Sequence, residues 1–107
     1  MKNINDFIGG WFVGDFSPSL LKTNQFEVAY KKYKAGDFEK KHLHKIAIEF
    51  TLIIEGEVLM NNVKYYEGDI ITIKPNESTD FRAITDTKTV VVKTPSITND
   101  KYILDND

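Results

Sequence analysis

The sequence predicts an all-β protein, an antiparallel sandwich or barrel. About eight or more short runs have the alternating or continuous apolar pattern of strands, and turn residues separate them about every six to twelve positions. No stretch sustains the period of a helix. Closing such strands into a barrel leaves no long unpaired edge. At 107 residues the chain is expected to form one domain, residues 1–107, around a single core.

Residues 1–24 form an N-terminal extension with a weaker pattern. Aromatic side chains gather there between glycines, which disfavour a long helix: Phe7, Trp11, Phe12 and Phe16. We expect a short extended piece at residues 11–13. The aromatic side chains are expected to pack on the barrel or on a partner subunit.

The barrel core is expected to span residues 25–95. Its predicted strands lie at residues 25–31, 38–44, 49–54, 57–60, 63–66, 70–73, 78–84 and 88–93. Pro95 ends the last strand, and the polar tail at residues 98–107 offers Tyr102, Ile103 and Leu104 as anchors.

Composition excludes several classes of protein. The net charge is −2 and the pI is near 5.7, so neither nucleic acid nor an anionic membrane is expected as a partner. The absence of cysteine rules out disulfides, thiolate metal ligands and cysteine nucleophiles. No run has the length of a signal peptide or a transmembrane span, and a cytoplasmic location is expected.

The stretch from Gly36 to Gly56 contains the candidate site. It holds both histidines of the chain, His42 and His44, and Glu49 follows five residues after the second. In a strand, positions two apart point to the same face, and Phe38 would share that face with the histidines. Two imidazoles and a carboxylate directed at one point favour a divalent metal ion.

The same stretch resembles the first cupin motif. In that motif a glycine is followed by five residues, His-x-His, three or four residues, a glutamate, six residues and a glycine, and every fixed position is filled here. The resemblance implies a double-stranded β-helix, or jelly-roll barrel, with His42, His44 and Glu49 inside it as metal ligands. Carboxylate oxygens among the ligands favour Mn or Fe as the ion, and histidine nitrogens also suit Ni and Zn.

The second cupin motif is only partly present. Counting from Pro75 places Asp80 where the fourth metal ligand, a histidine, is expected, and Ile84 where an asparagine is expected. The spacer between Gly68 and Pro75 is one residue longer than in the motif. Asp80 would therefore be a fourth metal ligand, a general base beside a three-ligand ion, or the ion-pair partner of Arg82.

Arg82 is the only arginine in the chain and shares a strand face with Asp80 if no bulge intervenes. Its guanidinium would bind a carboxylate or phosphate of a ligand in a bidentate way, or form a structural ion pair with Asp80 or Glu49. Asp80 and Arg82 are thus the candidate catalytic residues. Further wall residues of the barrel would come from Tyr30, Tyr33, Thr51 and Ile53.

Three functions follow from the resemblance. The first is a metal-dependent enzyme acting on a sugar, nucleotide sugar or organic acid, as an isomerase, epimerase, lyase or dioxygenase. The second is a module that binds such a small molecule without turnover, and the third is a metal-free structural cupin. A homodimer is expected in each case, because small barrels with exposed edges and similar cupins commonly pair.

Overall fold

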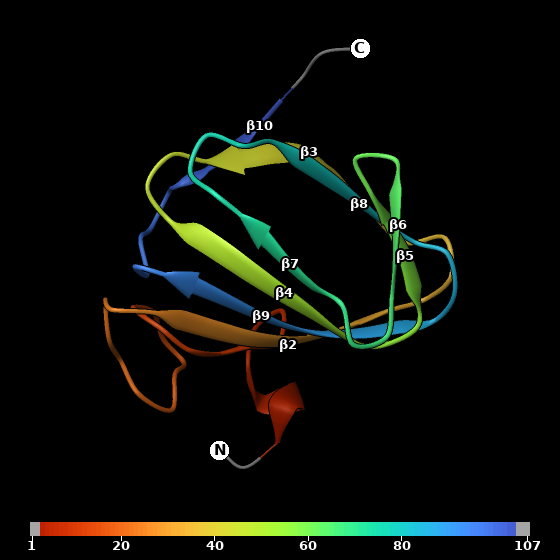
Figure 1. The fold of residues 1–107 in the computed structure, drawn as a ribbon. Coiled ribbons are helices and arrows are strands. Elements are labelled where there is room, and N and C mark those ends of the chain that lie inside the picture. Colours follow the sequence, from red (N-terminus) through yellow and green to blue (C-terminus); the bar gives the residue numbers. More distant parts are fainter. Residues whose placement is uncertain (1–2, 105–107) are drawn as a thin grey trace.

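The computed structural model describes residues 3–104 and consists of two five-stranded antiparallel sheets that face each other (Figure 1). The first sheet has the order β1 (Trp11–Val13), β2 (Glu27–Tyr33), β9 (Thr87–Thr94), β4 (Ile48–Glu55) and β7 (Ile70–Ile73). The second has the order β10 (Lys101–Ile103), β3 (Phe38–His44), β8 (Thr79–Ala83), β5 (Glu57–Met60) and β6 (Val63–Tyr66). The predicted all-β class is confirmed.

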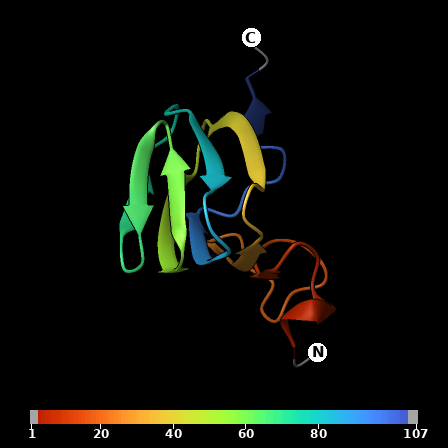
Figure 2. The ribbon, with the colours of Figure 1, turned by 90° about the vertical axis from the view of Figure 1, so that its right-hand side faces the viewer.

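Two elements were not predicted as regular structure. A short 3-10 helix, η1 (Ile4–Asp6), precedes β1 and lies outside the barrel (Figure 2). Part of the expected polar tail forms β10, which pairs with β3 beside both histidines. Residues 105–107 of that tail lie outside the described part of the chain.

The N-terminal segment is attached to the barrel through β1, which pairs with β2. Gly10 makes this close approach because its φ is +82° and a Cβ there would collide with the carbonyl of Tyr30. The amide of Tyr30 in turn donates to the carbonyl of Gly10 over 3.0 Å. In the described residues no helix is long and apolar enough to cross a membrane.

The apolar core fills one end of the space between the sheets. Its buried members are Ile53, Val58, Met60, Ile73, Phe81 and Ala83. Tyr33, Tyr65 and Ile71 pack against this cluster. The other end of the barrel carries polar side chains on its inner wall, and the core forms the floor beneath them.

A β-bulge in β3 decides which side chains of that strand face inward. Opposite β8, Glu39 pairs with Phe81 and His42 pairs with Thr79, so the β3 side has one residue more. The expectation that Phe38 shares a face with the histidines is therefore wrong. The bulge turns Glu39 inward, whereas Phe38 is 60% exposed.

Candidate functional site

The candidate site is a pocket of about 180 Å³ between the two sheets. Met60 and Phe81 connect it to the apolar core. Eight acidic or basic side chains of three kinds line its wall: His42 and His44, then Glu27, Glu39 and Glu49, then Lys31, Lys93 and Lys101. The contacts among these groups determine which of them remain available to a ligand.

His42 is held by the bulge of its own strand. Its Nδ1 lies 2.8 Å from the carbonyl oxygen of Lys40, and only the ring can donate in that pair. The proton therefore lies on Nδ1, and in the neutral ring Nε2 carries the lone pair. A backbone carbonyl on the second ring nitrogen is the usual way in which proteins orient a metal-binding histidine.

His44 lies beside His42, with the ring centroids 5.5 Å apart and the planes nearly perpendicular. The ammonium of Lys93 donates to Nε2 of His44 over 3.3 Å. Burial, followed by the positive charges of Lys93 and His42, lowers the pKa of His44 to about 4. The ring is consequently neutral at pH 7, and its Nε2 lone pair faces a cation.

Glu49 begins the inward face of β4 and lines the same pocket. Its Oε2 accepts a hydrogen bond from the hydroxyl of Thr51 over 3.1 Å. Thr51 is buried and lines the pocket as expected, and Ile53 belongs to the apolar core below it.

The structure thus brings His42, His44 and Glu49 to one pocket, but it does not converge them. Within residues 3–104, no group of three or more histidine, cysteine, aspartate or glutamate side chains is arranged to hold a metal ion. The donor types nevertheless suit a divalent transition metal. The Lys93 ammonium, itself a cation, already contacts Nε2 of His44. A metal ion bound at that nitrogen would have to displace it.

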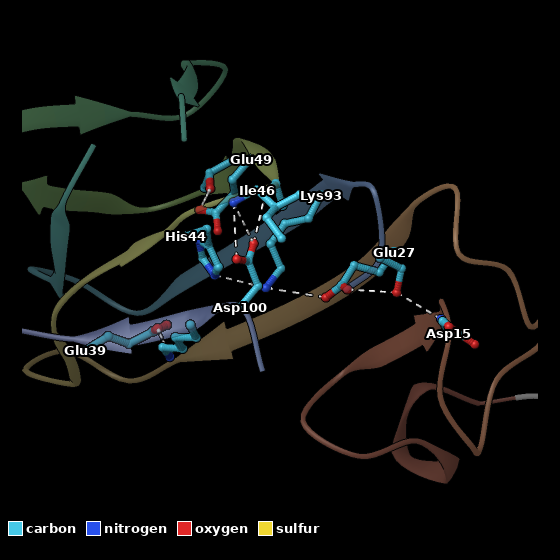
Figure 3. A network of polar contacts seen from close by, with 12 residues as sticks. Asp15, Glu27, Glu39, His44, Ile46, Glu49, Lys93 and Asp100 are labelled. Carbon is cyan, nitrogen blue, oxygen red and sulfur yellow. Dashed lines mark hydrogen bonds and ion pairs between the residues drawn. The ribbon is translucent and has the colours of Figure 1, made fainter. Parts of the chain in front are cut away.

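Lys93 is the end of a chain of polar contacts that reaches the N-terminal segment (Figure 3). Its ammonium lies 3.4 Å from the Glu27 carboxylate, which accepts from the hydroxyl of Ser96 over 2.9 Å. That hydroxyl accepts from the amide of Asp15 over 2.9 Å. Glu27 and Ser96 are buried, so the chain fixes the Lys93 side chain toward His44.

Asp100 lies beside His44 and Lys93 and bonds to the turn that follows His44 (Figure 3). Its buried carboxylate accepts from the backbone amides of Lys45, Ile46 and Ala47 over 2.9–3.2 Å, and these residues form the turn directly after His44. Burial by itself would raise the pKa of Asp100, but the three amide donors lower it below its ordinary value. The carboxylate is therefore ionised at neutral pH and fixes the β3–β4 turn.

Asp80 and Arg82 lie on the outer face of β8 and not in the pocket. An oxygen of Asp80 accepts from the amide of Asn61 over 2.8 Å, and Arg82 is exposed with its guanidinium 5.5 Å from the ring of Phe38. The two do share a face, but no ion pair joins them among the described residues. As placed here, neither can contact a ligand that lies beside His42 and His44.

Thr79 occupies the inward position opposite His42 in place of Asp80. Because strand side chains alternate, a shift of one residue moves a whole strand to the other face. Counting the second motif from Gly68 instead of Pro75 places Thr79 at the position of the fourth metal ligand. It also places Asn76 at the position of the glycine in the turn. Asn76 has a φ of +69°, the conformation that glycine supplies at such a turn.

Two charged inward residues of β2, Glu27 and Lys31, were not predicted as site residues, whereas Tyr33 was predicted as a wall residue. Glu27, Lys31 and Tyr33 line the pocket, and Tyr30 lies on the opposite face of the strand. The hydroxyl of Tyr33 donates to Glu39 over 2.6 Å. Burial and the Glu39 carboxylate raise the pKa of Tyr33, so it stays a donor. The alternation of the strand was visible in the sequence, but burial of its charged face was not.

A scan against protein-family models and a search of curated proteins find no match. A conserved protein with a double-stranded β-helix domain from Klebsiella pneumoniae is 18% identical, with a TM-score of 0.72 over 99% of this chain and 92% of that one. An RmlC-like cupin from Shewanella frigidimarina is 16% identical, with a TM-score of 0.65 over 71% of each chain. Oxalate decarboxylase from Bacillus subtilis is 16% identical, with a TM-score of 0.66 over 76% of this chain and 24% of that one. At these identities the likeness shows a shared fold.

Proposed function

From the premise that this chain folds as a cupin domain, we propose that its pocket binds a small oxygen-rich molecule beside a divalent metal ion. His42, His44 and Glu49 would hold the ion. The observation that carries the proposal is that Glu49 and both histidines of the chain line one pocket. The Bacillus oxalate decarboxylase that shares the fold has Mn(II) centres.

When bound, the ion would act as a Lewis acid on a carbonyl or carboxylate oxygen of the ligand. The residues of the chain prepare the site for it. The Lys40 carbonyl orients His42, and the low pKa of His44 keeps that ring unprotonated at neutral pH. The Thr51 hydroxyl holds the Glu49 carboxylate through a hydrogen bond of 3.1 Å. The likeness to cupins, and not the donor set itself, favours a sugar, nucleotide sugar or organic acid as the ligand, through isomerase, epimerase, lyase or dioxygenase chemistry.

A second candidate function is favoured by the contact between Lys93 and His44. In this alternative the ammonium is the working cation of the pocket, and the domain binds its small ligand without a metal or turnover.

The two candidates are separated by titrating the purified protein with Mn²⁺ and Ni²⁺ in a calorimeter. The metal-dependent function predicts one ion per chain, with binding weakened by about a hundredfold or more in His44→Ala. Asp80→Asn is the matched control and should bind like the wild type, because Asp80 lies outside the pocket. No binding by the wild type would favour the metal-free alternative, and equal binding by His44→Ala would reject the assigned ligands.

A further inference from the structure

Lys31 is the one lysine of the pocket wall without an ion-pair partner among the described residues. Lys93 pairs with Glu27, and Lys101 lies 3.7 Å from Glu39. No carboxylate of residues 3–104 lies within ion-pair distance of Lys31, whose ammonium is instead 5.3 Å from the centre of the Trp11 ring. Burial, opposed by Glu39 and reinforced by Lys101 and Lys93, lowers the pKa of Lys31. A lowered pKa is expected for a partly buried ammonium that lacks a paired counter-ion.

Thr89 provides a second and independent observation at the same place. It is 1% exposed and lines the pocket, and its hydroxyl is the only buried side-chain polar atom of the described residues without a hydrogen-bond partner. A buried hydroxyl left unpaired costs about 1–3 kcal/mol. Such a group is expected to have a partner that the protein alone does not supply.

The two groups belong to one subsite. Lys31 on β2 is directly paired with Thr89 on β9, and both side chains line the pocket. Side chains at directly opposed positions have their Cβ atoms about 5 Å apart. An ammonium and a hydroxyl at this spacing can both donate to the oxygens of a single anionic group.

We propose that Lys31 and Thr89 form an oxyanion subsite that binds a carboxylate or phosphate group of the ligand. The charge of the pocket supports an anionic ligand: three lysines and three glutamates cancel formally, and a divalent ion would leave an excess of positive charge. This last step rests on the proposed function, whereas the unpaired lysine and hydroxyl do not. The anion anchor expected at Arg82 thus lies at Lys31.

The chain supplies its own reporter for this subsite, because Trp11 is its only tryptophan and lies against both Lys31 and Lys93. Metal-free protein is titrated with malonate, inorganic phosphate and the neutral malonamide, following tryptophan fluorescence and, in parallel, calorimetric heat. Saturable binding of malonate or phosphate is expected, with none for malonamide. The tighter of the two anions identifies the group that the subsite takes.

Lys31→Met should weaken anion binding by about tenfold or more, since it removes the charged donor. Lys32→Met, the matched control on the next and exposed position of β2, should leave it unchanged. Thr89→Val should weaken anion binding without lowering the melting temperature, because the lost hydroxyl has no partner in the protein. Weaker anion binding at an unchanged melting temperature would not arise if Thr89 only stabilised the fold. The Thr89→Val variant therefore tests the subsite even if Lys31→Met folds poorly.

Equal anion affinity in Lys31→Met and Lys32→Met would overturn the inference, as would binding of malonamide as tight as that of malonate. So would the absence of malonate and phosphate binding to the wild type, with and without Mn²⁺. A metal titration of Lys31→Met distinguishes this failure from that of the proposed function. If the protein binds metal but its anion affinity does not depend on Lys31, only the proposed subsite is rejected. If its anion affinity depends on Lys31 but it binds no metal, only the metal-dependent function is rejected.

Discussion

Thr87 and Thr89 lie on the inward face of β9 and are almost equally buried, at 2% and 1% exposure. Their hydroxyls differ in one respect. That of Thr87 donates to the carbonyl of Thr85 over 2.8 Å, whereas that of Thr89 has no partner in the part of the chain that the structure describes. The first hydroxyl therefore contributes to the stability of the fold, and the second is the one that we propose donates to a ligand.

Thr87→Val is expected to lower the free energy of unfolding by about 1 kcal/mol, because it leaves the carbonyl of Thr85 without its donor. Thr89→Val should leave the unfolding free energy unchanged or raise it. Urea unfolding of both variants, compared with the wild type, measures the difference. An equal loss in the two variants would mean that Thr89 has a partner within the fold.

Lys93 is the residue that opposes metal binding most directly. Its ammonium is 3.3 Å from Nε2 of His44 and 3.4 Å from the Glu27 carboxylate. Removing the lysine alone would leave a buried carboxylate without its counter-ion, which is strongly destabilising. The informative variant neutralises both partners.

Lys93→Met/Glu27→Gln is expected to bind Mn²⁺ or Ni²⁺ about tenfold more tightly than the wild type, since the competing cation is gone. Glu27→Gln alone serves as the control, because it keeps the ammonium at His44. Calorimetric titration of the three proteins gives the comparison. Weaker metal binding in the double variant would show that Lys93 supports the ion and does not compete with it.

The turn between β3 and β4 depends on a residue distant in sequence. Asp100 accepts the amide hydrogen bonds of the turn at residues 45–47 and thereby fixes the end of the strand that carries His44. Since the folded state lowers its pKa below the ordinary 3.8, Asp100 stabilises the fold fully above that value. This stabilisation declines as the pH falls through the folded pKa, where the folded carboxylate also takes a proton.

Asp100→Asn should lower the unfolding free energy at pH 7 by about 1–3 kcal/mol, because an amide oxygen is a weaker acceptor than a carboxylate. The difference from the wild type should shrink as the pH falls below 3.8. Urea unfolding at pH 7, 4 and about 2.5 measures it. A difference that is independent of pH would show that the charge of Asp100 does not stabilise the turn.

The strands show how far the sequence could be interpreted. Alternation and turn residues located the β-elements from β1 to β9, since both signals are local. The face of β8 was misassigned at Asp80 because the position was counted from Pro75, which lies one residue further from Gly68 than in the motif, and a shift of one residue reverses every side chain of a strand. The bulge in β3 was likewise invisible, because two lysines at positions 40 and 41 fit a regular strand as well as a bulged one. What the sequence could not supply was the register between distant strands.

On the scale of the whole molecule, the barrel divides into an apolar end and an ionisable end. The first cupin motif was sufficient to predict the fold and the place of His42, His44 and Glu49. It did not predict the lysines that share the pocket with them. Charged side chains are normally exposed, so their burial follows from the assembled sheets and not from any single segment.

The outer face of the first sheet is where we expect a second copy to bind. The outward residues of β4 are all apolar: Ile48, Phe50, Leu52 and Ile54. Ile70 on the neighbouring β7 continues the face and is 66% exposed. A patch without charges of its own can pair with an identical patch across a two-fold axis. We therefore predict a homodimer.

Light scattering should give a mass of about two chains for the wild type, whereas Phe50→Glu/Ile70→Glu should be a folded monomer because it buries four like charges at a symmetric interface. Thr72→Glu, on the same outer face beside Phe50, should weaken the dimer less. A wild-type protein that is monomeric at high concentration would contradict this assignment.

The central claim is that a divalent ion binds inside the barrel at His42, His44 and Glu49. The most direct measurement is an anomalous difference map from a crystal of the full chain soaked with Mn²⁺. We predict one strong peak between His42 Nε2, His44 Nε2 and the Glu49 carboxylate, with the Lys93 ammonium withdrawn from His44. A map with no peak in the pocket, or with its peak at Asp80 on the outer face of β8, would contradict the claim.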